Sequence, residues 1–301
     1  MLSTDASAAE TSAWHCPHCE QPLTLESNSW RCANNHSFDR ARQGYVNLLP
    51  SNRKQSKQPG DSPEMVLARS RFLDTGHYQP LRQAVLSVLG SQTTPTRGNW
   101  LDAGCGEGWY TAALQQEFPA MKGFAFDISK SAVSTCCRRS KAVHWAVASV
   151  ANIPLGNRSI EFILSIFSRI DWPQFQRILA DEGLLLAVTP GSHHLLELRQ
   201  AIYTEVRLHE EEKVLKQMPE AFDCVLTQSC EFQFTLENQQ QIQDLLAMTP
   251  HYWHIRPDQR ERLGLLQTLT TRADFRLELF RKKTPAQASL NPWKKSHSSN
   301  E

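Results

Sequence analysis

The sequence predicts an α/β protein with a doubly wound, mostly parallel sheet, preceded by a small metal-binding module. From Asn99 onward, short apolar runs that fit strands alternate with segments that fit helices, as in sheets built from crossover units. Residues 100–110 fit a strand end, a tight glycine turn and a helix start. Cysteines and a histidine near the N-terminus have the spacing of metal knuckles.

Composition bounds the class of protein. With 301 residues and 40% hydrophobic content, the chain can bury the core of one large domain and one small domain. The formal net charge of +1 indicates no particular partner. Residues 1–13 lack the apolar core of a signal peptide, and no apolar run reaches the length of a membrane span, so we expect a cytoplasmic protein. The eight cysteines then indicate metal ligands and buried thiols, not disulfides.

The first motif is a pair of knuckles formed by Cys16, Cys19, Cys32 and His36. Three thiolates and one imidazole supply a closed tetrahedral set for a structural zinc ion, with no open position for a substrate. The alternative is four unrelated residues. A segment of this size buries little core, so we expect zinc to stabilise it as a core separate from the rest of the chain.

A basic stretch follows the knuckles. Residues 30–60 hold six arginines and lysines against Asp39 alone, and three of the cations are Arg53, Lys54 and Lys57. This excess predicts a mobile loop that meets nucleic-acid phosphates. The alternative is a set of solvated charges that contact nothing.

The remaining elements follow from periodicity and from helix-start signals. We expect two linking helices, at residues 63–73 and 78–89. The later expected helices are residues 110–118, 129–139 and 172–180, and the expected strands are residues 100–101, 123–126, 143–147, 162–167, 184–189 and 273–280.

The glycine turn contains Gly104, Gly106 and Gly108, with Asp102 two residues ahead. Glycine accepts positive φ and has no Cβ, so the backbone can approach a ligand. A dinucleotide turn has its third glycine one residue later. The observed spacing resembles the first motif of the class I S-adenosylmethionine (SAM) methyltransferases. The alternative is an ordinary strand-to-helix turn.

Asp127 ends the apolar run of the second expected strand. A carboxylate at that place can accept hydrogen bonds from both ribose hydroxyls, so we assign Asp127 to the ribose. It is also a candidate N-cap for the helix that follows, and one residue can serve both purposes.

Several motifs in order resemble the bacterial 23S rRNA (guanine-N1)-methyltransferases of the RlmA type. They are the knuckles, Gly44-Tyr-Val-Asn-Leu-Leu-Pro50, Gly60-Asp-Ser, Met65-x-x-Ala-Arg69, Phe72-Leu-Asp-x-Gly-His-Tyr78 and Leu101-Asp-x-Gly-Cys-Gly-Glu-Gly108. The similarity runs from Cys16 to about Pro257. It implies the fold of a class I SAM-dependent methyltransferase, Rossmann-like with a mostly parallel seven-stranded sheet, and a small N-terminal zinc-binding domain.

The resemblance also implies the substrate and the cofactor residues. The substrate would be N1 of a guanosine in a hairpin loop of 23S rRNA (position 745-type), and the enzyme would be a homodimer. SAM would be bound by Tyr78, Gly104, Gly106, Glu107, Asp127 and His194. From the residues alone, Tyr78 is equally a core tyrosine, and His194 more often a cap or surface histidine.

Three segments depart from the family pattern. Ser149 stands where many relatives carry an acid for the adenine amine, residues 165–171 replace an Ala-Pro-Cys type segment that lines the target-base pocket, and residues 180–183 replace a Lys-Pro-Gly-Gly turn. Guanine N1 carries a proton at neutral pH, so the reaction needs a general base or hydrogen bonds to O6. Asp61, His77 and Asp171 are candidates, and we assign no catalytic residue.

The sequence thus divides into five parts. Residues 1–13 are a disordered N-terminus, 14–50 a zinc-binding RNA-recognition domain, 51–98 a basic loop with linking helices, 99–281 the SAM-dependent methyltransferase domain, and 282–301 a disordered tail. The predicted function is N1 methylation of a guanosine in 23S rRNA. Two alternatives remain at this point: a zinc-containing methyltransferase for a small molecule or protein, and an RNA-binding protein with a non-catalytic SAM site.

Overall fold

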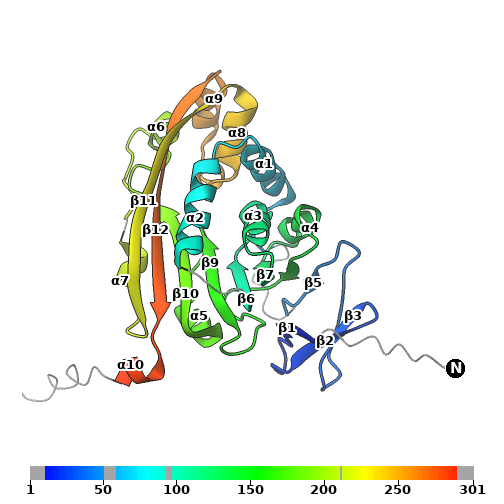
Figure 1. Cartoon of the computed structure of the whole chain (residues 1–301). Coiled ribbons are helices and arrows are strands. Elements are labelled where there is room, and N and C mark those ends of the chain that lie inside the picture. Colours follow the sequence, from blue (N-terminus) through cyan, green and yellow to red (C-terminus); the bar gives the residue numbers. More distant parts are fainter. Residues whose placement is uncertain (1–10, 51–58, 93–96, 211, 290–301) are drawn as a thin grey trace, which may run out of the picture.

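A computed structural model describes residues 11–50, 59–92, 97–210 and 212–289 of the chain (Figure 1). Its strands form two sheets, one with four strands and one with eight. Figure 1 shows the small sheet, in dark blue, next to β5. The three cations expected in a mobile basic loop, Arg53, Lys54 and Lys57, lie outside the described residues.

The small sheet is antiparallel throughout and carries the metal knuckles on its turns. Its strands are β1 (Thr11–His15), β2 (Pro22–Glu26), β3 (Ser29–Arg31) and β4 (Ser37–Asp39). Glu20 and Asn35, each on a turn that holds two knuckle residues, have φ of 60°, the left-handed conformation of tight turns. The first strand begins within residues that the sequence assigns to the disordered N-terminus.

The large sheet has the order β11-β12-β10-β9-β6-β7-β8-β5. Its strands are β5 (Val46–Asn47), β6 (Asn99–Ala103), β7 (Lys122–Asp127), β8 (His144–Val147), β9 (Ile160–Ile166), β10 (Leu179–Pro190), β11 (Phe222–Leu236) and β12 (Leu269–Lys282). The strands from β5 to β10 pair in parallel, and β12 and β11 add an antiparallel edge. The fold class is therefore confirmed. Residues 180–183, which replace the Lys-Pro-Gly-Gly turn of the family, lie within β10 and not in a turn before it.

The predicted count of seven strands is wrong by one. The eighth strand is β5, which comes from the expected N-terminal domain and pairs in parallel with β8 at the sheet edge, Val46 opposite Ala146. The cause is local: Gly44, with φ of 115°, turns the chain back from Arg40 so that Val46 reaches the edge. The N-terminal module is thus hydrogen-bonded to the large sheet.

Helices occupy the connections as the alternating pattern predicts. They are α1 (Pro63–Asp74), α2 (Gln79–Gln92), α3 (Trp109–Glu117), α4 (Lys130–Arg139), α5 (Trp172–Ile178), α6 (Leu196–Ile202), α7 (Lys213–Lys216), α8 (Gln239–Ala247), the 3-10 helix η2 (Pro250–Trp253), α9 (Pro257–Gly264) and α10 (Pro285–Ser289). Ser62, Ser129 and Asp171 accept hydrogen bonds as side-chain N-caps of α1, α4 and α5. No helix in the described ranges is long and apolar enough to cross a membrane.

The expectation of two separate cores is wrong. One buried cluster joins Trp14 and Trp30 of the N-terminal module to Phe124 and Phe126 of β7. The rings of Trp14 and Phe124 meet edge to face, with centroids 5.2 Å apart. No helix links β8 to β9, and Trp14 instead forms a bridge to Leu155 in that connection. The module therefore covers a sheet face that a crossover helix would otherwise cover.

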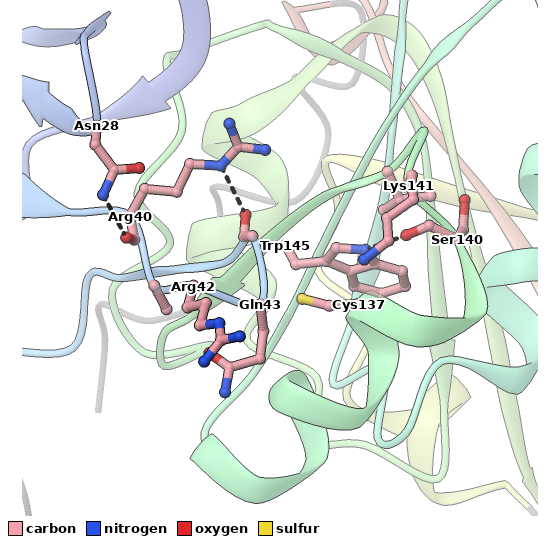
Figure 2. Close-up of a pocket in the computed structure, with 11 residues that line it drawn as sticks. Asn28, Arg40, Arg42, Gln43, Cys137, Ser140, Lys141 and Trp145 are labelled. Atoms are coloured by element: carbon pink, nitrogen blue, oxygen red, sulfur yellow. Dashed lines mark hydrogen bonds between the residues drawn. The ribbon is translucent and has the colours of Figure 1, made fainter.

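A cavity of about 330 Å³ lies where the module meets the large domain (Figure 2). One wall is the turn that precedes β5, at residues 40–44. The other is the end of α4 and the turn into β8, at residues 137–145. No residue of the glycine turn lines this cavity.

Candidate cofactor site and metal centre

The glycine turn connects β6 to α3 with positive φ at all three glycines, 85° at Gly104, 55° at Gly106 and 86° at Gly108. A Cβ at Gly104 would collide with the side chain of Ser168, and one at Gly108 would lie 3.1 Å from Cys136 and from Trp145. The outer glycines are therefore needed for packing. A Cβ at Gly106 would meet only the side chain of Arg69. The backbone of Gly106 is therefore the part of the turn that a ligand can approach, on the side where Arg69 lies.

Asp127, at the carboxyl end of β7, holds this turn. Its Oδ2 accepts from the Gly106 N–H at 3.0 Å, and its Oδ1 accepts from the Ser129 N–H at 2.8 Å. Burial raises the pKa of Asp127, and these two backbone hydrogen bonds oppose the rise. Each carboxylate oxygen still has a lone pair, so the group can accept further hydrogen bonds from a ligand. The side-chain cap of α4 is Ser129, so Asp127 is not that N-cap.

Asp102 has a structural position. It is 2% exposed and accepts a hydrogen bond of 2.6 Å from Thr111 Oγ1, which ties α3 to β6. Burial raises the pKa of Asp102 to about 7. The acid two residues before the glycine turn thus anchors the helix that follows.

Arg69 is a residue that sequence reasoning quoted without a role. Its guanidinium would be 3.4 Å from a Cβ at Gly106, and it forms an ion pair with Asp61. The Asp61 carbonyl in turn accepts from Ser129 Oγ at 2.8 Å. A cation over a glycine that has no side chain is a fitting partner for a ligand carboxylate. Its place in the Met65-x-x-Ala-Arg69 motif is the one signal in the sequence.

Two further polar residues lie in or directly after the glycine turn, Glu107 within it and Tyr110 in the first turn of α3. The hydroxyl of Tyr110 is buried and has no hydrogen-bond partner among the described residues, which fits a site that a ligand completes. Glu107 is paired through its carboxylate with Arg139, 2.5 Å away, and its side chain is 1% exposed. Burial raises the pKa of Glu107, and Arg139 opposes the rise. The Glu107 carboxylate is thus directed at α4.

An aromatic cluster contains the other two residues implied by the resemblance. Tyr78 is buried against Phe72 and Phe275, and His194 lies 4.7 Å from Phe275 between ring centroids. His194 Nδ1 accepts from the Asp274 N–H at 3.3 Å, which leaves the proton on Nε2. Burial lowers the pKa of His194 to about 3, so the ring is neutral at physiological pH.

Phe167 connects this cluster to the glycine turn. It follows β9, has φ of 52° and is 44% exposed. Its ring stacks on His194, with centroids 6.1 Å apart and planes 27° apart. The next residue, Ser168, packs against Gly104. A left-handed phenylalanine is strained, and such strain is concentrated at functional positions. The sequence placed residues 165–171 at the target-base pocket, but it did not single out Phe167 within them.

The three candidate proton acceptors have different surroundings. Asp61 lies beside Arg69 at the glycine turn. His77 packs against Phe72 and Phe234, and burial lowers its pKa. Asp171 caps α5 by accepting from the Gln174 N–H. Ser149, which stands where many relatives carry the acid for the adenine amine, accepts from the Ala151 N–H in its own turn.

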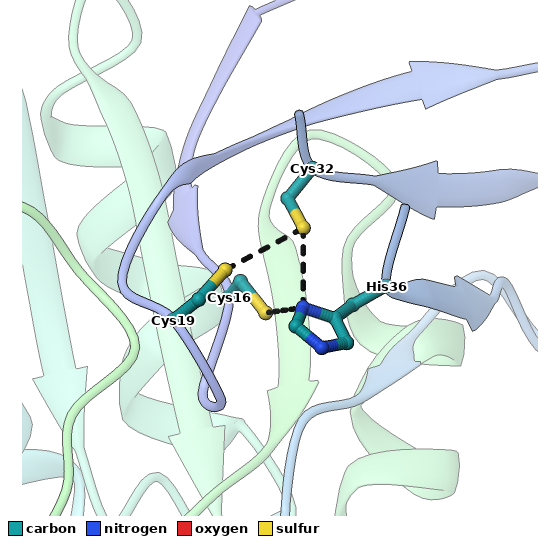
Figure 3. A group of neighbouring side chains, drawn as sticks. All are labelled: Cys16, Cys19, Cys32 and His36. Atoms are coloured by element: carbon teal, nitrogen blue, oxygen red, sulfur yellow. Dashed lines mark hydrogen bonds between the residues drawn. The ribbon is translucent and has the colours of Figure 1, made fainter. Parts of the chain in front are cut away.

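The knuckle residues come together as one cluster (Figure 3). The separation of Cys19 Sγ from Cys32 Sγ is 3.6 Å, and His36 Nδ1 lies 3.5 Å from the sulfurs of both Cys16 and Cys32. Zinc–sulfur bonds of about 2.3 Å place the corners of a tetrahedron about 3.7 Å apart. These three separations are close to that value, and all four ligand atoms lie within 4.8 Å of one another, so the cluster fits a zinc ion.

Comparisons with known proteins agree with both parts of the chain. A family model described as "RlmA, N-terminal", a zinc ribbon, matches residues 14–57, and one described as "Methyltransferase domain" matches residues 101–187. The chain is 35% identical over 250 residues to the 23S rRNA (guanine(748)-N(1))-methyltransferase of Streptomyces fradiae, covering 82% of this chain and 88% of that protein. Two proteins provisionally named 23S rRNA (guanine-N(1)-)-methyltransferases are also similar, one from Micromonospora griseorubida (31%, covering 88% and 96%) and one from Bacillus subtilis (32%, covering 89% and 95%).

Proposed function

The chain belongs to the 23S rRNA (guanine-N1)-methyltransferase family, and from this premise we propose that it transfers a methyl group from SAM to N1 of a guanosine in a 23S rRNA hairpin loop. One observation carries the proposal: the two strands that carry the glycine turn and its carboxylate share a buried core with the Cys3His cluster. The rival substrates, a small molecule or a protein, are not favoured, because relatives named for rRNA match across both parts.

We propose the following cofactor contacts. Asp127 binds the ribose hydroxyls with the lone pairs that Gly106 and Ser129 leave available. Arg69 binds the carboxylate of the methionine moiety above Gly106, and Tyr110 donates or accepts beside it. SAM supplies a methyl group activated by its positive sulfur. The reaction is an in-line displacement, so the protein mainly has to fix donor and acceptor in attack geometry.

Cys16, Cys19, Cys32 and His36 are the proposed zinc ligands. All four positions of a tetrahedral ion are then taken by protein, so the zinc is structural. We propose that it fixes the N-terminal module against the large sheet, where the module can contact the hairpin. The expected homodimer stays a prediction, which sedimentation velocity tests, and so does the cytoplasmic location.

Phe167 is our proposed platform for the target base. A base in a hairpin loop has to leave its stack before it reaches the cofactor, and an exposed aromatic face can replace the lost stacking. The Phe167 ring is 44% exposed and follows the strand next to the glycine turn. Because Ser168 packs on Gly104, the backbone that carries the Phe167 ring lies beside the turn.

A Phe167→Ala variant should methylate hairpin RNA about tenfold or more slowly in kcat/KM, because stacking of one base on an aromatic ring contributes roughly 1–3 kcal/mol. Phe167→Tyr should retain most of the rate. SAM affinity, measured by calorimetry, should be unchanged in both variants. If Phe167→Ala methylates as fast as the parent, the base does not stack there.

The function itself is tested by primer extension on 23S rRNA. N1-methylguanine blocks the Watson–Crick edge, so reverse transcription stops beside it. Deleting the protein should remove one such stop, and adding the purified protein and SAM to the undermethylated RNA should restore it. The Streptomyces fradiae relative is named for guanine 748, so the position of the stop distinguishes that guanosine from one of the 745 type. If every stop persists after deletion, the rRNA assignment is wrong.

A further inference from the structure

The cavity between the two parts of the chain has a lining that no proposed contact uses (Figure 2). Its volume is about 330 Å³, and a neighbouring hollow of about 260 Å³ shares Arg40, Lys141 and Trp145 with it. The two walls are the turn before β5 and the turn between α4 and β8. The cavity is thus formed by both the N-terminal module and the large domain, and neither part makes it alone.

The charged side chains that line this cavity are all positive. Arg40, Arg42 and Lys141 line the cavity, and neither hollow includes an aspartate or glutamate. None of the three cations forms an ion pair within the part of the chain that the structure describes. By contrast, Arg69 and Arg139 both have carboxylate partners. Three exposed cations around one hollow attract an anion, and the other polar side chains there, Asn28, Gln43 and Ser140, can donate hydrogen bonds to it.

The walls are held in place without help from a ligand. Arg40 Nε donates to the Gly44 carbonyl at 3.3 Å, and Asn28 Nδ2 donates to the Arg40 carbonyl at 3.2 Å. On the other side, Trp145 Nε1 donates to the Ser140 carbonyl at 3.0 Å. These bonds fix the two turns, and none of the hydrogen bonds drawn in Figure 2 involves the terminal nitrogens of Arg40. A preformed site binds its ligand at a lower entropic cost.

The cavity also adjoins the cofactor turn. Trp145 lies in its wall, and the far edge of the same indole is 3.1 Å from the place of a Cβ on Gly108. The indole of Trp145 therefore separates a group held in the cavity from the glycine turn. A large substrate that reaches the cofactor can contact both places at once, whereas a small one cannot.

We propose that this cavity binds a backbone phosphate of the substrate RNA, with Arg42 and Lys141 as its principal contacts. The inference rests on the proposed function, because it takes the hairpin as the substrate. The phosphodiester is the anion that every nucleotide of that substrate carries. Arg42 comes from the N-terminal module and Lys141 from the large domain, so one phosphate would be held by both parts and would fix the hairpin relative to the cofactor turn.

The test measures binding of a fluorescently labelled 23S rRNA hairpin over a range of salt concentrations. The double variant Arg42→Gln/Lys141→Gln removes two charges from the cavity, while Arg40 is kept because it fixes the turn. The matched control is Arg97→Gln/Lys213→Gln, which removes two exposed charges that do not line the cavity, one just before β6 and one on α7. Melting temperature and SAM affinity are measured to check that both variants are folded.

The cavity variant should bind the hairpin about tenfold more weakly, and its plot of log K against log salt should be flatter by about one to two units. The control should match the parent in both. If the two double variants bind the hairpin equally well, the inference is wrong. If the parent still methylates the hairpin in that case, the proposed function is unaffected. A parent that neither binds nor methylates the hairpin overturns both. A third outcome is that the parent binds inorganic phosphate, that Arg42→Gln/Lys141→Gln abolishes this binding, and that RNA binding is unchanged. The cavity would then be a site for a free anion, and the inference would also be wrong.

Discussion

Replacing Cys32 by serine is expected to remove the zinc ion and to lower the melting temperature of the whole chain, not of the N-terminal module alone. Isolated zinc modules draw roughly 10 kcal/mol or more of folding free energy from the metal. Here the buried Trp14 and Trp30 of the module pack in one cluster with Phe124. Loss of zinc would expose that cluster to water and free β5 from the sheet edge, so a decrease of about 10 °C or more is expected.

Elemental analysis and differential scanning calorimetry measure this result. Cys224→Ser is the matched control, because Cys224 lies on β11, away from the cluster of knuckle residues. It should retain one zinc per chain and the parent melting temperature. Two separate transitions in Cys32→Ser, with the upper one at the parent temperature, would mean that the module melts independently. Zinc retained at full occupancy would exclude Cys32 as a ligand.

The parts of the site that the sequence predicted are those whose chemistry is local. Two knuckles with fixed spacing place four ligand atoms together whatever surrounds them, and the structure holds these atoms within 4.8 Å of one another. The glycine turn and the strand end at Asp127 are also local, because parallel strands bring their carboxyl ends to one edge. Short-range spacing was therefore sufficient for both.

Side chains that reach the site from other elements were beyond sequence reasoning. Arg69 on α1 meets Gly106, and Ser168 meets Gly104, through packing that no spacing rule specifies. Phe167 has a left-handed φ that a phenylalanine rarely adopts, so its exposure could not be read from its type. Conversely, Asp102 looked like part of the cofactor motif, but its buried hydrogen bond to Thr111 makes it a helix anchor.

The same limit explains the wrong strand count and the wrong expectation of two separate cores. The eighth strand contains only Val46 and Asn47, which is too short to show a period of two. The shared core depends on Trp14 reaching Phe124 across more than one hundred residues of chain. A motif match marks the N-terminal module as a unit, but the apolar surface of that unit decides what it packs against.

Replacing Asp127 by alanine is expected to weaken SAM binding more than tenfold, as measured by calorimetry. Two hydrogen bonds from ribose hydroxyls to a charged acceptor contribute roughly 2–4 kcal/mol in total. The structure adds a second reason: the alanine variant also removes the acceptor of the Gly106 N–H, so the turn itself loosens. Asp258→Ala, which removes an exposed carboxylate on α9, is the charge control and should bind SAM as the parent does.

Two further variants separate these reasons. Asp127→Asn keeps one side-chain oxygen for a backbone N–H but turns the other acceptor into a donor, so its affinity should lie between those of the parent and the alanine variant. Gly106→Val should lose the most, because a β-branched residue at φ of 55° is strained and its Cβ would lie 3.4 Å from Arg69. Unchanged affinity in Asp127→Ala would remove the ribose role. Losses of the same size in Asp127→Ala and Asp127→Asn would assign the effect to the ribose hydroxyls, because the asparagine can still hold the turn.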